Sequence, residues 1–358
     1  MRSSVDYLDF DQLTDIDVQV WTRLQSADPS LASPYFSYAY VKAVNTVRPG
    51  VKVLKLHQRG QIAAYWPFRK GPLGTARPVA GPMDDLHGII AHPKAVLDLS
   101  QPAIRRSIGG YSFSATPFSQ RRHGLTGQYG SGNQVMDLSD GYDAWREARS
   151  TESSNFRREW RKVENLLSDP GVKVRHDIVD GESFDRLIEL KREAYAGAGH
   201  FDLFKLNWPK ALLLELLKSD DDHARGVLST LSIDGETAAM AYCMRSTSVL
   251  HYWFPAYEAK FAKQKPGLAL LFALAEWADD EGLQEIHLGL GETQYKRQMA
   301  SWMMPVRGGA LALAPAQQFA TDFSKWSTHI EGPNWFRNVP AKYARKYERM
   351  ALTGSWRA

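Results

Sequence analysis

The sequence of 358 residues contains a single cysteine and lacks any long hydrophobic run. With Cys243 alone, the chain has too few thiols for an intramolecular disulfide or for a cysteine-based zinc site. The apolar run at 267–278 is far shorter than the roughly 20 residues that cross a bilayer, and residues 1–15 are acidic and polar, unlike a signal peptide. We therefore expect a cytoplasmic protein that holds no metal and is soluble, or at most peripheral at the inner membrane face.

Net positive charge is concentrated at the C-terminal end. The net charge is +4, yet the residues from Arg337 onward carry six basic side chains against Glu348 alone, an excess of five. The rest of the chain is nearly neutral, which argues against DNA as a partner. The basic tail over 331–358, with Tyr343 and Tyr347 one turn apart, is expected to be helical. Three interpretations stay open: a solvated helix, a surface for anionic lipid, or a site for an acidic nucleotide.

Two segments predict β-hairpins with the same internal spacing. Residues 51–68 and 226–244 both contain the pattern Leu-x-x-x-Gly-x-x-Ala-Ala. Gly60 follows an arginine and Gly235 follows an aspartate, and both dipeptides lie between alternating apolar residues, which is a strong local hairpin signal. The repeat is consistent with two similar α/β units in tandem, and chance similarity between strand-turn-strand segments is the alternative.

Around these hairpins, apolar periodicity predicts helices and further strands. The expected helices lie at 11–27, 35–47, 144–169, 182–196 and 208–218. The expected strands lie at 111–115, 134–138, 248–254 and 284–290. The helix at 144–169 carries one apolar stripe, formed by Phe156, Trp160, Val163 and Leu167. This order predicts an α/β fold with two domains, at 1–150 and 151–330, each a mixed, partly antiparallel sheet flanked by helices.

The stretch KQKPGLALL places cations and a Pro-Gly pair directly before an apolar segment that favours a helix. A helix N-terminus offers unpaired N–H groups and the positive end of the helix dipole, which together favour phosphate. Gly267 lets a diphosphate approach the backbone, and proline is at home in a first helical turn. An ordinary helix start with solvated lysines is the alternative. The candidate phosphate-binding residues are Gln264, Lys265, Pro266, Gly267, Leu268 and Ala269.

Residues 250–300 combine this Pro-Gly turn with a helix that ends in glycine and a strand that runs into Gly-[Asp/Glu]-x-x-Tyr-Lys. The combination resembles the CelD/BcsL-type acetyltransferase domain of bacterial cell-surface polysaccharide loci, within the GNAT acyltransferase superfamily. Lys265 stands where that family has serine, and His287 stands where it commonly has aspartate. The resemblance extends less specifically over most of the chain. It implies tandem GNAT-like domains, the acyl-CoA site in the second, and a more distant similarity to Fem-type aminoacyltransferases.

The resemblance also implies the chemistry. An acyl group would pass directly from acetyl-CoA to an amine, with no covalent intermediate, and Glu292 would be the base and Tyr295 the acid. Lys296 would hold an anionic group of substrate or cofactor. His251 and His287 are alternative bases, because imidazole titrates near neutral pH, unless they are structural strand residues. For Glu292, Tyr295 and Lys296, the alternative is that they are polar surface residues of a helix.

The acceptor side is less specific. The resemblance places the loop that carries Asp85 and His87 near an acceptor cleft between the two domains. Arg158 lies on a basic helix face that suits an acidic or phosphorylated acceptor. Ordinary solvated surfaces are the alternative for all three residues.

The resemblance implies that the acceptor is an amino sugar or related precursor, free or lipid-linked, in exopolysaccharide or holdfast-like adhesin production. Two other functions stay open. One is a Fem-type transferase that takes aminoacyl-tRNA, and the other is a non-catalytic regulator that senses a nucleotide through the basic tail. The sequence gives no signal for the oligomeric state.

Overall fold

The computed structural model describes residues 3–71 and 75–313. Its contacts divide the chain into two compact units. Among the described residues, unit 1 holds 3–30, 44–71, 75–130 and 306–313, and unit 2 holds Leu31–Ala43 and Ser131–Pro305. The basic tail predicted at 331–358 lies outside the described residues.

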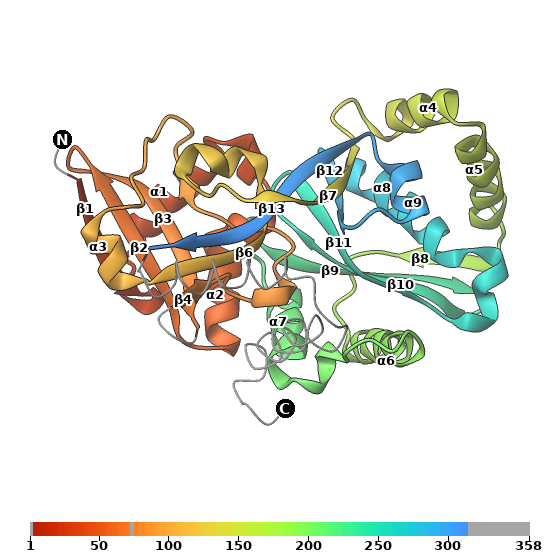
Figure 1. The fold of residues 1–358 in the computed structure, drawn as a ribbon. Helices are drawn as coiled ribbons and strands as arrows, with labels where there is room; N and C mark the ends of the chain where they lie inside the picture. Colours follow the sequence, from red (N-terminus) through yellow and green to blue (C-terminus); the bar gives the residue numbers. More distant parts are fainter. Residues whose placement is uncertain (1–2, 72–74, 314–358) are drawn as a thin grey trace, which may run out of the picture. The chain divides into compact units, whose positions relative to one another are not determined.

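Unit 1 is built on a mixed sheet (Figure 1) with the strand order β1-β2-β3-β4-β6-β13, in which β4 and β6 run parallel and β5 pairs with β3. Its strands are β1 (Ser3–Asp9), β2 (Val51–Gln58), β3 (Gln61–Lys70), β4 (Thr75–Arg77), β5 (Ile90–Ala91), β6 (Gly110–Pro117) and the part of β13 (Trp302–Ala312) from Val306 onward. Its helical segments include α1 (Asp15–Ser26), the second half of α2 (Tyr38–Val47), and α3 (Pro102–Ser107). A buried cluster around Trp66, Phe68 and Tyr111 forms its core.

Unit 2 has the strand order β7-β12-β11-β10-β9-β8, parallel between β11 and β12 and antiparallel elsewhere. Its strands are β7 (Gln128–Asp137), β8 (Val172–Arg175), β9 (Arg225–Ile233), β10 (Glu236–Arg245), β11 (Val249–Tyr257) and β12 (Glu285–Leu290). Its helices are α4 (Tyr142–Glu152), α5 (Ser154–Leu167), α6 (Gly181–Gly197), α7 (Asn207–Leu217), α8 (Pro266–Asp280) and α9 (Gln294–Met299). Figure 1 shows α8 with α4 and α5 on one face of this sheet and α6 and α7 on the other. The predicted α/β fold class, with mixed sheets flanked by helices, is confirmed.

Both predicted hairpins form, and their turns have the same backbone geometry. Arg59 and Gly60 join β2 to β3 with φ values of 53° and 78°, and Asp234 and Gly235 join β9 to β10 with 51° and 83°. Two consecutive positive φ values are typical of a type I′ turn, whose twist matches that of the flanking strands. The Arg-Gly and Asp-Gly dipeptides therefore fix both hairpins locally.

The two hairpins also share a β-bulge. The pairing of β2 with β3 skips Ala63, and the pairing of β9 with β10 skips Ala238. Each alanine is the first of the Ala-Ala pair in the repeated sequence pattern. An extra residue in one strand bends that strand and increases its twist. The repeat in the sequence is thus a repeat of turn and bulge together.

The single helix predicted at 144–169 is wrong, because the structure divides it into α4 and α5. Ser153 lies between them in extended conformation, and its Oγ accepts a hydrogen bond from the backbone N–H of Phe156 at 3.2 Å. A serine side chain that caps a new helix competes with continuation of the previous one. The predicted apolar stripe does face the core, since Phe156 and Val163 are buried and Trp160 and Leu167 pack against the same cluster.

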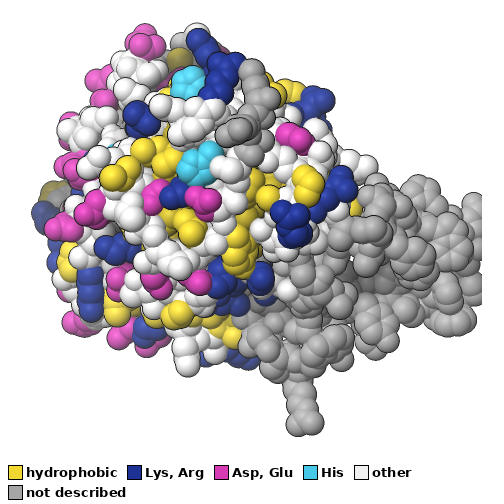
Figure 2. All heavy atoms as spheres, turned by 90° about the vertical axis from the view of Figure 1, so that its left-hand side faces the viewer, with side chains coloured by type: hydrophobic (Ala, Val, Ile, Leu, Met, Phe, Trp, Pro, Cys, Tyr) yellow, Lys and Arg dark blue, Asp and Glu magenta, His cyan; other side chains and the backbone are white. Residues whose placement is uncertain are grey.

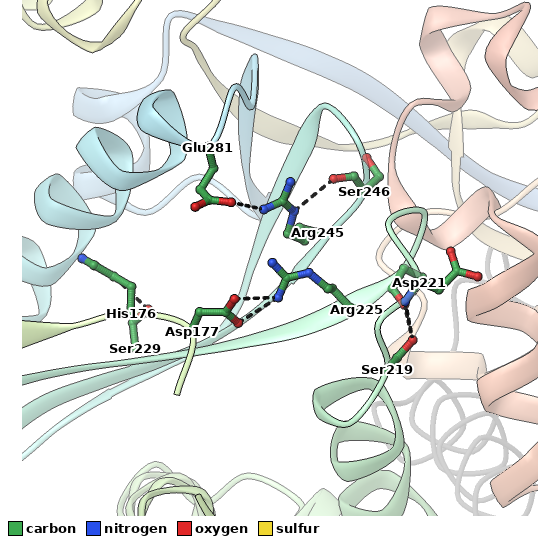
Figure 3. A network of polar contacts seen from close by, with 10 residues as sticks. His176, Asp177, Ser219, Asp221, Arg225, Ser229, Arg245, Ser246 and Glu281 are labelled. Carbon is green, nitrogen blue, oxygen red and sulfur yellow. Dashed lines mark hydrogen bonds and ion pairs between the residues drawn. The ribbon is translucent and has the colours of Figure 1, made fainter. Parts of the chain in front are cut away.

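Helix α8 is anchored at its C-terminal end by a buried arginine. Arg245, at the end of β10, donates from Nη1 to Oε2 of Glu281, which caps α8, at 2.9 Å, and from Nε to the carbonyl oxygen of Ser246 (Figure 3). A cation is favourable at a helix C-terminus, and an arginine that is 8% exposed requires such partners. In the same view, Arg225 forms a bidentate contact with Asp177. The contact between Arg245 and Glu281 ties the C-terminal end of α8 to the end of β10.

The described surface is mixed in charge on the face that Figure 2 shows. Lysine and arginine side chains there are interspersed with aspartate and glutamate side chains, so that face lacks the continuous basic surface that nucleic acid requires. None of the helices within residues 3–71 and 75–313 is long and apolar enough to cross a membrane.

A buried carboxylate joins α1 to the sheet of unit 1. Asp17 is 2% exposed and accepts hydrogen bonds from the Thr14 backbone and side chain, from the Tyr65 hydroxyl at 2.8 Å and from the Lys55 ammonium at 3.1 Å. Burial disfavours the charged carboxylate, but these hydrogen bonds outweigh it and lower the pKa of Asp17 to about 2. The stability of unit 1 therefore depends on this carboxylate remaining ionised.

We predict that Asp17→Asn lowers the free energy of unfolding by about 2 kcal/mol at pH 7, because the pKa in the folded state lies well below that in the unfolded state. A depressed pKa stabilises the protein fully above about pH 4, and this contribution disappears as the pH falls through about 2. Urea denaturation of wild type and variant should therefore converge at low pH. Asp15→Asn, at an exposed position of the same helix, is the control, and a gap between Asp17→Asn and wild type that is independent of pH would contradict the assignment.

Candidate functional site

The central feature of unit 2 is the separation of β11 from β12. The two strands pair in parallel over three residues each and stop at His251 and His287. Within the described residues, β11 continues to Tyr257 and β12 to Leu290. The strands therefore diverge beyond the last paired residues, and strand edges that face such an opening can receive an extended ligand.

A β-bulge lies in β11 immediately beyond this point. Tyr252 pairs with Cys243 and Phe254 pairs with Tyr242, so Trp253 is left between them without a partner in the ladder of β10. A bulge bends its strand and redirects the neighbouring side chains. The bulge therefore directs the end of β11 away from β12.

Helix α8 begins at the end of this opening. Its N-cap is Lys265, which has the left-handed φ of 54°, and Pro266 is the first helical residue. The N–H groups of Leu268 and Ala269 donate to the carbonyl oxygen of Lys265 at 3.0 and 3.2 Å. The N–H of Gly267 has no acceptor among the described residues. In its first turn, the helix thus offers one amide and the positive end of its dipole.

A pocket of about 530 Å³ opens beside these elements, wholly within unit 2. Its walls come from five segments: the end of β11, the 3-10 helix Ala259–Gln264, the start of α8 with its N-cap, one side of α5 and one side of α9. The residues that line it are Asn155, Arg158, Glu159, Tyr252, Pro255, Ala256, Tyr257, Ala262, Lys265, Pro266, Gly267, Leu268, Leu271, Gln294, Tyr295 and Gln298. The pocket has an apolar interior beside β11 and α8, and a charged wall where α5 approaches Lys265.

The charged wall centres on Glu159. Its carboxylate contacts Nζ of Lys265 at 2.5 Å and Nζ of Lys162 at 3.2 Å. The hydrogen bond from Lys265 lowers the pKa of Glu159 despite its burial, so the carboxylate is ionised at neutral pH. A left-handed conformation costs a non-glycine residue roughly 1 to 3 kcal/mol. The contact with Glu159 helps to hold Lys265 in that conformation.

Tyr295 supplies the pocket with a proton donor. Burial raises the pKa of Tyr295 to about 12, so its hydroxyl is protonated at neutral pH and can donate but not act as a base. Tyr252 also lines the pocket, and its complete burial raises its pKa further. Of the predicted catalytic residues, Tyr295 is the one that the structure places on the pocket wall.

The predicted phosphate-binding residues divide into two groups. Lys265, Pro266, Gly267 and Leu268 line the pocket, whereas Gln264 is exposed outside it and Ala269 faces the core. Because the amides of Leu268 and Ala269 already bond to Lys265, the available cradle is smaller than the sequence pattern predicts. The predicted Arg158 does line the pocket, and its guanidinium donates to Oδ1 of Asn155 at 2.5 Å.

The two predicted histidines lie opposite each other at the last paired position of β11 and β12 and do not line the pocket. His287 is 1% exposed, with Nε2 at 2.8 Å from Oε2 of Glu285 and Nδ1 at 3.4 Å from Nδ2 of Asn133. The ring of His251 packs edge-on against Tyr35, with the ring centroids 5.1 Å apart. Both histidines thus belong to the packing that ends the strand pairing.

Glu292 and Lys296 flank Tyr295 in sequence but also do not line the pocket. The carboxylate of Glu292 is half exposed and lies 3.9 Å from Nη1 of Arg297. The ammonium of Lys296 donates to the carbonyl oxygen of Leu290 at 2.7 Å and so holds the end of β12. Their roles as base and as anion-binding residue stay predictions of the family resemblance.

Asp85 and His87 belong to unit 1. Nε2 of His87 accepts hydrogen bonds from the N–H groups of Ser114 and Ala115 at 3.1 and 3.2 Å. Burial lowers the pKa of His87 to about 3, so the ring is neutral and Nε2 is occupied by the backbone. Their predicted contact with an acceptor stays a prediction.

Sequence reasoning missed several residues of the pocket wall. Glu159 lies in a strongly basic segment, 157–162, where a single acidic residue is typical of a surface ion pair. Gln294 and Gln298 flank Tyr295 at helical spacing, and this one-turn interval is the signal that would have found them. Within the described residues, no group of three or more His, Cys, Asp or Glu side chains could hold a metal ion.

Comparison with known proteins identifies the type of domain. Residues 151–297 match the family profile described as "Acetyltransferase (GNAT) domain". No curated protein matches the chain significantly. A crystal structure named FemX superposes with a TM-score of 0.58 at 10% identity, over 88% of this chain and 98% of that chain.

Two further structures superpose over a similar share of this chain. The C-terminal domain of a protein from Agrobacterium fabrum, named as a lysylphosphatidylglycerol synthetase, gives a TM-score of 0.55 at 13% identity, over 89% of this chain and 98% of that domain. A tandem GNAT protein from the clavulanic acid biosynthesis pathway gives a TM-score of 0.50 at 11% sequence identity, over 88% of this chain and 99% of that chain. Identities this low show the fold alone, which is that of tandem GNAT units. Together with the profile match, they confirm the predicted enzyme class, an acyltransferase.

We predict that Cys243 has no catalytic role. It is fully buried in β10, and burial raises the pKa of its thiol, so no thiolate nucleophile forms. Cys243→Ala should keep the turnover of acyl donor within about twofold while lowering stability by about 1 kcal/mol, and iodoacetamide should leave the native enzyme active. Loss of turnover in a variant with an unchanged circular dichroism spectrum would point to a covalent intermediate.

Proposed function

We propose that this protein is an N-acyltransferase that binds an acyl-CoA thioester, with acetyl-CoA as the simplest donor, in the pocket of unit 2. The observation that carries the proposal is the meeting of three features: diverging parallel strands, a pocket of about 530 Å³, and the N-terminus of α8 at its edge. The divergence admits an extended thioester arm, and the start of α8 favours its phosphates. Each feature alone occurs in proteins of many functions, but their coincidence supports a donor site.

The phosphate end of the donor would lie against Gly267 and Lys265. The N–H of Gly267 is available there, and the ammonium of Lys265 is half exposed on the pocket wall. Arg158, from the facing helix α5, adds a second, largely exposed cation. The apolar walls beside Leu268 and Leu271 would cover the thioester arm.

At the thioester, a neutral amine attacks the carbonyl carbon, the new C–N bond forms and the C–S bond breaks. The Tyr295 hydroxyl is suited to donate a hydrogen bond and a proton to the departing sulfur, and it regains the proton from solvent. The amine loses its own proton to solvent, or to Glu292 if the loop that carries it approaches the pocket. No bond to the protein forms, which agrees with the inert Cys243.

For the acceptor, we propose an amino sugar or a related precursor, free or lipid-linked, of a bacterial cell-surface polysaccharide. This proposal is supported by the resemblance of residues 250–300 to the CelD/BcsL type and implies a cytoplasmic enzyme, whose docking at the inner membrane face would rest on the basic tail. The similarity to FemX favours one alternative, transfer from aminoacyl-tRNA through the same pocket. The nucleotide-sensing alternative rests on the tail outside the described residues.

Gly267 is the position that tests the phosphate site. A Gly267→Glu substitution puts a carboxylate where the donor phosphates would lie, so it should abolish binding of acetyl-CoA in calorimetric titration. Gly267→Ala is the matched control, because an added Cβ would meet only Cδ1 of Tyr257 at 3.7 Å, an ordinary contact.

Both Gly267 variants should retain the wild-type circular dichroism spectrum, since the position is the second residue of α8 and accepts side chains. Aminoacyl-tRNA is titrated in parallel to separate the two donors. Unchanged affinity of Gly267→Glu for acetyl-CoA would remove the phosphate site from the start of α8.

Tyr295 is the position that tests the acid role. Tyr295→Phe keeps the ring on the pocket wall and removes the proton donor, so kcat should fall about 100-fold with little change in KM for the donor. Turnover of acetyl-CoA with an amino-sugar acceptor measures both constants. Tyr129→Phe, at an exposed tyrosine outside the pocket, should behave like wild type. An equal fall in kcat in both variants, or a change in KM with kcat unchanged, would rule out the acid role.

A further inference from the structure

Glu159 is an unexpected component of a pocket wall that would face phosphates. It lies in the second turn of α5, is 8% exposed and lines the pocket beside Lys265. A buried carboxylate repels a phosphate at close range, so a carboxylate at this end of a donor site has to be offset by nearby cations.

The contacts of Glu159 place one carboxylate among three cations. Its Oε2 contacts Lys265 at 2.5 Å, and its Oε1 lies 3.2 Å from Nζ of Lys162 and 3.9 Å from Nε of Arg158. Lys162 and Arg158 belong to the same helix as Glu159, whereas Lys265 belongs to the N-cap of α8. Lys265 is therefore the cation that joins this cluster to the start of α8.

We infer that Glu159 is the specificity-determining residue of the donor end: it holds Lys265 in place of a ligand phosphate and must release it when a phosphate binds. The inference rests on the proposed function of the pocket. Glu159 then competes with the donor phosphate for the ammonium of Lys265. The binding free energy gained from that phosphate is the difference between the Lys265–phosphate and the Lys265–Glu159 ion pairs.

Two further observations favour this role over a simple surface ion pair. The first turn of α8 leaves one amide, that of Gly267, for a ligand, so Lys265 has to supply much of the attraction for a phosphate. The ammonium of Lys265 is 51% exposed, whereas the carboxylate of Glu159 is 11% exposed. The lysine can therefore turn toward a ligand while the carboxylate stays in the wall.

The consequence is a pocket that distinguishes donors by their phosphate charge. A ligand without phosphate does not compete for Lys265 and does not meet the Glu159 carboxylate. A ligand with one or more phosphates displaces the lysine and remains near a fixed negative charge, which weakens its binding. Such a site would weaken the binding of acyl-CoA and of coenzyme A alike, because both carry the same phosphates.

The test compares Glu159→Gln with wild type for a graded series of probes: pantetheine, 4′-phosphopantetheine, dephospho-coenzyme A and coenzyme A. Calorimetry measures the dissociation constant of each. The glutamine keeps the size and the hydrogen-bonding capacity of the side chain and removes its charge. We expect affinity for the three phosphate-bearing probes to rise about tenfold, with pantetheine unchanged.

Glu164→Gln, which removes an exposed carboxylate from the same helix, is the matched control and should leave the whole series unchanged. Lys265→Gln provides a second variant at a half-exposed position, should Glu159→Gln fail to fold. It should weaken the phosphate-bearing probes alone.

The outcomes separate the two proposals. A change of equal size for all four probes, or none, means that Glu159 is structural and overturns the inference while the donor site stands. Failure of all four probes to bind wild type overturns the proposed function, and the inference with it.

Discussion

The pocket of unit 2 depends on one interruption in hydrogen bonding. β11 and β12 pair over three residues and then separate, although both strands continue. Since α8 connects the end of β11 to the start of β12, it has to begin where the opening lies. The positive end of its dipole is thereby directed at the opening by chain connectivity alone. The bulge at Trp253 and the contact between Arg245 and Glu281 maintain this arrangement from two sides.

Within this frame, the chemistry is divided between two ends of the pocket. Tyr295 supplies a protonated hydroxyl among apolar walls, where a leaving sulfur would need a donor. Lys265, Arg158 and Glu159 form a charged end, where the first turn of α8 itself offers little. The first turn of α8 thus contributes orientation and one amide, while Lys265 and Arg158 contribute positive charge that Glu159 partly offsets. This division explains how a start of α8 with proline at its first position can still attract an anion.

The fold was largely predictable because its signals are local. The dipeptides at Gly60 and Gly235 determine two hairpins through their positive φ values, and apolar periodicity locates α6, α7 and α8. The break between α4 and α5 was missed, since a serine that caps one helix looks the same in sequence as a serine within a longer one. Ser153 changes the path of the chain through a single hydrogen bond.

The site was less predictable, because its residues come together from segments more than 100 positions apart. Lys265 and Tyr295 could be found from the pattern around them, but Glu159 acquires its importance from a contact with Lys265 that sequence spacing does not reveal. His287 is attractive as a base in sequence, and its role stays a prediction. The fold adds what the sequence does not reveal, which is that the ring contacts Glu285 and Asn133 at the end of the strand pairing.

The extra alanine in each hairpin has a consequence for which changes the strand tolerates. Deleting such a residue would turn every later side chain of the strand to the opposite face, so an inserted residue is difficult to lose once a core has formed around it. Ala63 and Ala238 occupy equivalent positions in the two hairpins, so the same restriction on strand length applies in both units.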